Sequence, residues 1–162
     1  MGTKRSTMLV DPLRQGLPPL DPATASSAAS CALHARYEAV RDARQFTQRT
    51  LYGWGLANRF DDTCLVVSEL VTNALKHALP SDAMCEGEPP VRLHLMHWTS
   101  RLVCAVRDPS QESPVAVEPE AADLAAESGR GLYLVESFSD GWGWHPLAGA
   151  LRGKVVWALF HV

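Results

Sequence analysis

The sequence lacks several features that would place the protein in a common class. It has no run of about eighteen apolar residues, and its first residues contain no continuous apolar segment, so neither a membrane span nor a signal peptide is predicted. Positive charge is not in excess: the formal net charge is −3, whereas nucleic-acid-binding domains usually present a basic face. We therefore expect a cytoplasmic protein that binds small molecules or proteins, with no direct contact to nucleic acid or membrane.

Cysteine is scarce and scattered. The sequence has four cysteines and no CxxC pair: Cys31, Cys64, Cys85 and Cys104. Cys64 and Cys104 fall within apolar patterns, which is typical of reduced core residues. A zinc site built with His94 and His97 is disfavoured, because alternation along a strand would place these two side chains on opposite faces.

What is present is the composition of one globular domain with a tail. Apolar residues make up 46% of the chain and charged residues 20%, which is enough for a buried core. Residues 1–30 are rich in Pro, Ala and Ser without a sustained period, and we predict a disordered tail there. Residues 31–162 are then the folded domain. A short edge strand is predicted within 30–36.

Two helices are predicted in the first half of this domain. Apolar residues recur every three or four positions over 37–53, and Gly53 and Gly55 mark the end of that helix. A solvated face explains the arginines along it, with a partner-binding face as the alternative. These arginines are Arg36, Arg41, Arg44 and Arg49. The stretch 61–78 is a second amphipathic helix, which ends near Pro80.

The second half of the domain is rich in predicted strands. Residues 91–96 alternate in polarity, and the apolar run 102–106 follows a turn, so an antiparallel hairpin is predicted. Two tryptophans alternate across glycines near 142–144, and residues 153–162 form a last β-rich run. This order of elements favours an α/β (α+β) sandwich, in which helices cover one face of a mixed, mainly antiparallel sheet.

The second helix carries polar side chains that packing does not require. Glu69, Asn73 and His77 are spaced four residues apart with Lys76 beside them, so they line roughly one face. An Asn oxygen suits Mg²⁺, and a Glu one turn away can orient or deprotonate water. A polar helix flank explains the same residues, and on these residues alone it is the preferred interpretation.

A long acidic segment and a glycine pair follow the hairpin. Residues 109–128 have no clear period, which is typical of a lid or of simple surface disorder. Gly129 and Gly131 then precede a short predicted helix that contains Leu132. Glycines at this position allow backbone N–H groups to approach an anion at a helix N-terminus, and a tight turn into a packed helix would use them equally well.

Taken in order, SELVTNALKHA, VRDPS, GRGLYLVE and GKVVWALF resemble the motifs of the GHKL superfamily of ATP-binding domains, which use the Bergerat fold. More narrowly, they look like anti-sigma-factor serine/threonine kinases of the RsbW type, especially the single-domain ATP-binding regulators of actinomycetes. The resemblance covers about 31–162. It implies ATP and Mg²⁺ as cofactors, a sigma factor and a STAS-domain anti-anti-sigma protein as partners, phosphorylation of the latter, and a homodimer as one expected assembly.

The resemblance also implies roles for single residues of the second helix and the hairpin. Glu69 is the expected catalytic base, and Asn73 is the expected Mg²⁺ ligand. Lys76 or His77 would add a contact near the phosphates. Asp108 would accept a hydrogen bond from the adenine amino group.

The glycine-flanked arginine has an implied role of its own. Gly129, Gly131 and the following amides would hold the phosphates, with Leu132 packed nearby. Arg130 would stabilise charge on the transferring phosphoryl group, for which a guanidinium fork is well suited.

One motif departs from the family pattern. The superfamily usually has D-x-G-x-G at the adenine site, whereas this chain has Asp108, Pro109 and Ser110. Ser110 adds a side chain to the wall beside the base, where glycine would let the backbone pass closely. The alternative therefore stays open that the protein is a catalytically weak or inactive module that regulates transcription by sequestering a partner. A histidine kinase is disfavoured, because no helical segment with a phospho-acceptor histidine precedes the domain.

Overall fold

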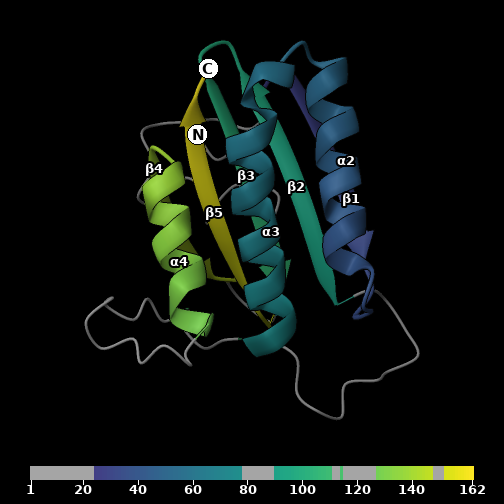
Figure 1. The fold of residues 1–162 in the computed structure, drawn as a ribbon, viewed down its shortest axis with the longest axis vertical. Coiled ribbons are helices and arrows are strands. Elements are labelled where there is room, and N and C mark those ends of the chain that lie inside the picture. Colours follow the sequence, from purple (N-terminus) through teal and green to yellow (C-terminus); the bar gives the residue numbers. More distant parts are fainter. Residues whose placement is uncertain (1–23, 78–89, 111–113, 115–126, 148–151) are drawn as a thin grey trace, which may run out of the picture.

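The computed structural model describes residues 24–77, 90–110, 114, 127–147 and 152–162; it does not describe the side chains of residue 77 and residues 127–130. Within these residues, three α-helices cover one face of a five-stranded sheet (Figure 1). The helices are α2 (Ala39–Gly53), α3 (Phe60–His77) and α4 (Glu127–Phe138), with a 3₁₀ turn, η2 (Ala57–Arg59), before α3. The strands are β1 (Ser27–Leu33), β2 (Val91–Trp98), β3 (Arg101–Asp108), β4 (Gly141–Pro146) and β5 (Lys154–His161).

The sheet has the strand order β1-β2-β3-β5-β4, and each of these neighbouring pairs is antiparallel. The predicted α+β architecture and hairpin are confirmed. The predicted edge strand also exists, but β1 runs from Ser27 to Leu33 and so begins inside the segment predicted as a tail. Its small residues give little apolar pattern, and backbone pairing with β2 holds it in place instead.

Both predicted helices of the first half are confirmed. In α2, four buried residues recur at four-residue spacing: Ala39, Ala43, Thr47 and Leu51. Thr47 satisfies its buried hydroxyl by donating to the Ala43 carbonyl at 2.8 Å. In α3, the expected apolar stripe is buried against α2 and the sheet, and each such valine or leucine contributes about 1.5–3 kcal/mol on burial.

Helix α4 differs from its prediction. Helix α4 begins at Glu127, so Gly129, Arg130 and Gly131 lie inside its first turns instead of preceding it. Two glycines within five residues each cost roughly 1 kcal/mol of helix propensity, which is why the sequence favoured a later start. Packing of α4 against α3 overrides this preference.

The sheet is buried on both faces. On the helix side, β2, β3 and β5 contribute to one core cluster together with α2, α3 and α4. On the other face, a second cluster contains Met96, Val103, Ala105, Leu147, Val155, Trp157 and Leu159. Cys64 and Cys104 are buried and reduced as expected, whereas Cys85 lies outside the described residues. Within the part of the chain that the structure describes, no helix is long and apolar enough to cross a membrane.

Candidate functional site

The predicted site residues gather at one end of the molecule. The C-terminal end of α3, the N-terminal end of α4, the end of β3 and the start of β5 all lie at the lower end of Figure 1. Helices α3 and α4 pack side by side, and α3 also contacts β3. Glu69 and Gly131 are therefore neighbours in space, as are Asp108 and Lys154, although the members of each pair lie far apart in the sequence.

Glu69 faces the glycine motif directly. A methyl group built on Gly131 would lie 3.0 Å from Glu69 Oε2, so the missing side chain of Gly131 leaves room for this carboxylate. Glu69 is half-buried, and this burial raises the pKa of its carboxyl group, partly offset by the charge of Lys76. The carboxylate is thus shifted toward the range in which it can accept a proton near neutral pH.

Asn73 lies one helical turn beyond Glu69 and is also half-buried. Among the described residues its carboxamide has no hydrogen-bond partner and is available to a ligand. Lys76, one turn further, is exposed and takes part in an interaction with another residue. The backbone of His77 closes α3, but its side chain lies outside the described residues.

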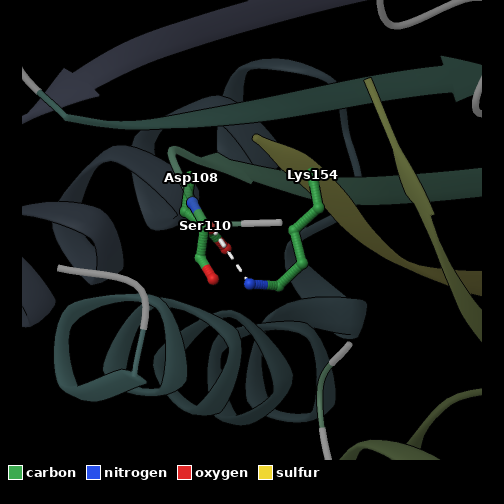
Figure 2. A network of polar contacts seen from close by, with 3 residues as sticks. All are labelled: Asp108, Ser110 and Lys154. Carbon is green, nitrogen blue, oxygen red and sulfur yellow. Dashed lines mark hydrogen bonds and ion pairs between the residues drawn. The ribbon is translucent and has the colours of Figure 1, made fainter. Parts of the chain in front are cut away.

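Asp108 is held in a buried polar network at the end of β3. Only 2% of the residue is exposed, and Oδ1 accepts hydrogen bonds from the Ser110 backbone N–H at 2.8 Å and from Lys154 Nζ at 3.0 Å (Figure 2). Burial raises the pKa of the Asp108 carboxyl, while Lys154 and the Ser110 N–H partly counter the shift. Ser110 contributes here through its backbone, in a short turn that needs no glycine at this position.

Lys154 is the residue that the sequence reading missed. It starts β5 opposite Asp108 in the strand register, and only 4% of it is exposed. A buried lysine is rare unless it is paired, and this one forms an ion pair with Asp108. The signal in the sequence is a single charge at the start of the apolar run GKVVWALF, and this pattern predicts only a strand.

Gly153 allows β5 to start this close to Asp108. Its φ of 123° is one that side chains rarely allow, and a methyl group there would collide with the Asp108 backbone carbonyl. The chain therefore turns into β5 against the backbone of β3, which directs Lys154 toward the carboxylate.

The glycine–arginine motif is described only in part. Leu132 is buried with 1% exposed, and Gly131 contacts Glu69. Arg130 and Gly129 lie in the helical backbone of α4, and the direction of the Arg130 side chain lies outside the description. The structure therefore brings together Glu69, Gly131 and the end of α3.

Residues 33–158 match the family model of the histidine kinase-like ATPase domain. The chain belongs to this family. The GHKL resemblance stated from the motifs is therefore confirmed, and an ATPase domain of this family implies ATP as its ligand. No curated protein matches the chain.

Two solved structures share the fold of this ATPase domain. One contains the RsbU and RsbW domains of Rv1364c from Mycobacterium tuberculosis, with 17% identity, a TM-score of 0.57, 83% of this chain covered and 32% of that chain. The other is the SiaB-SiaC complex from Pseudomonas aeruginosa, with 11% identity, a TM-score of 0.54 and coverages of 85% and 91%. The domain spans about a third of the mycobacterial chain. At these identities the likeness concerns the fold.

Proposed function

We propose that this domain is an ATP-dependent serine/threonine kinase that acts as an anti-sigma factor and phosphorylates a STAS-domain anti-anti-sigma partner. The observation that carries the proposal is the contact between Glu69 and Gly131, which joins a carboxylate–carboxamide helix to the glycine motif. Fold likeness to an RsbW domain and to SiaB supports the same class of regulator.

Glu69 would act as the base toward the attacking hydroxyl of the partner. Its raised pKa brings the carboxylate closer to the range where a general base is efficient at neutral pH. Phosphoryl transfer needs mainly positioning and charge stabilisation, so the protein would need to supply little more than one well-placed base and one guanidinium group. Arg130 would supply that guanidinium.

Asp108 would select adenine. The described hydrogen bonds to its side chain all end on Oδ1, so Oδ2 remains to accept the exocyclic amino group of the base. Lys154 favours the ionised form of the carboxyl, which is the form that accepts a hydrogen bond. This carboxylate would accept a hydrogen bond from the amino group of adenine, whereas it would repel the carbonyl oxygen of guanine.

This donor set fits a magnesium ion only when the nucleotide phosphates supply further ligands. Among the described residues no group of three His, Cys, Asp or Glu side chains could hold a metal, and the half-buried Asn73 amide is without a partner. Mg²⁺ commonly keeps its waters and takes one or two protein oxygens plus phosphate oxygens, which matches one carboxamide. When bound, the ion would neutralise charge on the phosphates, with Asn73 as its protein ligand; Lys76 and His77 would lie nearby.

The test is incubation of the purified chain with radiolabelled ATP and candidate STAS-domain proteins. We expect label on a serine or threonine of one partner, and we expect Glu69→Ala to remove this transfer while ATP binding persists. Transfer by the Glu69→Ala variant would show that the base is another group.

Two observations favour a second candidate, a binding module without kinase activity. Lys154 already occupies Oδ1 of Asp108, and the glycines of the usual D-x-G-x-G motif are absent. In that case the domain would regulate by holding its partner alone. ATP affinity measured with and without Mg²⁺ separates the two: failure to bind at millimolar ATP leaves only the module.

A further inference from the structure

Two arginines face each other on the sheet surface opposite α2, α3 and α4. Arg92 of β2 and Arg107 of β3 are direct partners in the antiparallel register. Their neighbours Leu93 and Val106 belong to the helix-side core, so strand alternation directs both arginines to the opposite face. Like charges placed directly opposite each other on one face destabilise a sheet. A bound anion would relieve this repulsion.

No acidic side chain in the described part of the chain supplies a counter-charge. The ion pair found there joins Lys154 and Asp108, on the other face of the sheet, and neither arginine has a hydrogen-bond or ion-pair partner within the described residues. Arg92 is exposed and Arg107 is half-buried, so the site is open to solvent on the β2 side.

A third polar group lies beside the arginines. His94 follows two positions after Arg92 on the same face of β2, and its Nε2 is buried without a hydrogen-bond partner. Burial, together with the charges of Arg92 and Arg107, lowers the pKa of His94 to about 4. The imidazole is therefore neutral at pH 7 and adds no positive charge beside the two arginines.

We propose that Arg92, Arg107 and His94 form a binding site for a phosphate-type oxyanion on the face of the sheet opposite α2, α3 and α4. Each guanidinium offers a planar fork of N–H donors, and the two positive charges match a dianion better than the single charge of a carboxylate. An anion held between the arginines converts their mutual repulsion into two attractive contacts. The neutral imidazole adds a polar side chain beside the arginines without adding charge.

This site is separate from the candidate nucleotide site. Asp108 directly follows Arg107 in the chain, but it points to the helix side, where it contacts Lys154 (Figure 2). The sheet lies between the two groups. The proposal therefore does not rest on the kinase proposal, and it is tested on nucleotide-free protein.

The experiment is a calorimetric titration of the full chain with inorganic phosphate, with sodium chloride at equal ionic strength as the blank. We expect saturable binding, weakened about tenfold or more in Arg92→Gln and in Arg107→Gln, because each variant loses a charge-assisted hydrogen bond. Arg101→Gln is the matched control, since Arg101 lies on the same face of β3 and pairs with Trp98 instead of an arginine. O-phosphoserine in a parallel titration distinguishes a phosphomonoester from the free anion as the preferred form.

A second measurement uses thermal unfolding in phosphate-free buffer of low ionic strength. Arg92→Gln and Arg107→Gln should each raise Tm relative to the parent protein, because each removes the repulsion, whereas Arg101→Gln should not. Equal phosphate affinity in all three variants would overturn the proposal. A lower Tm in both Arg92→Gln and Arg107→Gln would also overturn it, since the arginines would then be held by contacts within the chain.

Discussion

Replacing Lys154 with methionine would leave Asp108 as a buried carboxylate without its cationic partner. Lys154 is 4% exposed and Asp108 2% exposed, and their charged atoms are 3.0 Å apart. Removing one member of such a buried pair typically destabilises a protein by about 3–5 kcal/mol, because the remaining charge is desolvated and uncompensated. Methionine keeps the length and the apolar character of the lysine stem, so little packing is lost.

The protein can limit this loss by protonating Asp108. Protonation costs about 1.4 kcal/mol for each pH unit above the ordinary carboxyl pKa of 3.8. This cost is the upper limit, or ceiling, on the unfolding free energy that the variant can lose through the buried charge, and it rises with pH. The ceiling is about 4 kcal/mol at pH 7 and below about 2 kcal/mol at pH 5. We therefore expect Lys154→Met to lower the free energy of unfolding by about 3–4 kcal/mol at pH 7 and by about half of that or less at pH 5.

The sign of this pH dependence follows from the direction of the shift. Burial already raises the pKa of folded Asp108, so in the parent protein the contribution of this group to stability is greatest below pH 3.8 and declines as pH rises to the folded pKa. Without Lys154 the folded pKa is higher still, and the decline continues to higher pH. The difference between parent and variant must therefore grow as pH increases.

Urea unfolding followed by circular dichroism between pH 5 and 8 measures this difference. The matched control is the double variant Lys154→Met/Asp108→Asn, which buries neither charge and should recover most of the lost stability. A destabilisation of the same size at pH 5 and at pH 8 would refute the charge argument. So would a double variant no more stable than Lys154→Met, because the loss would then come from packing.

Three further predictions concern Gly131, Gly153 and His94. Gly131→Ala should keep or slightly raise Tm, since alanine gains up to about 1 kcal/mol of helix propensity. Its methyl group would lie 3.0 Å from Glu69 Oε2 and would push this carboxylate aside, so phosphoryl transfer should fall. Unchanged transfer would contradict the assigned contact. Gly153→Ala should lower the free energy of unfolding in urea by about 1–3 kcal/mol or more, because Gly153 has a positive φ and a methyl group there would clash with the β3 backbone. The control Gly53→Ala, whose methyl group meets open space, should be nearly neutral. The pKa of folded His94 is lowered to about 4, so the unfolded chain binds more protons between pH 4 and 6.5, and His94 lowers stability as pH falls through that window. His94→Gln should therefore flatten this part of the plot of unfolding free energy against pH. An unaltered slope would contradict the lowered pKa.

Much of the fold followed from local pattern. The apolar stripe of α3 repeats over several helical turns, and β2 alternates in polarity along its length. Glu69, Asn73 and Asp108 are predicted as site residues from their types and their order in the chain, and these roles stay predictions. The start of α4 was placed too late, since two glycines argue against a helix until packing against α3 is considered. Strand β1 was placed three residues too late, since its alanines and serines carry no apolar signal.

The sequence by itself determined the order of the elements, the helical face that carries the carboxylate and carboxamide, and the family to which the motifs point. Only the tertiary structure decided which charges meet. Lys154 and Asp108 are 46 positions apart, and Arg92 and Arg107 are 15 apart. The register of the β2–β3 hairpin brings Arg92 opposite Arg107, whereas the pairing of β3 with β5 and a backbone turn at Gly153 bring Lys154 to Asp108. The physical reason is that pairing between strands far apart in sequence depends on long-range packing, which no local period encodes.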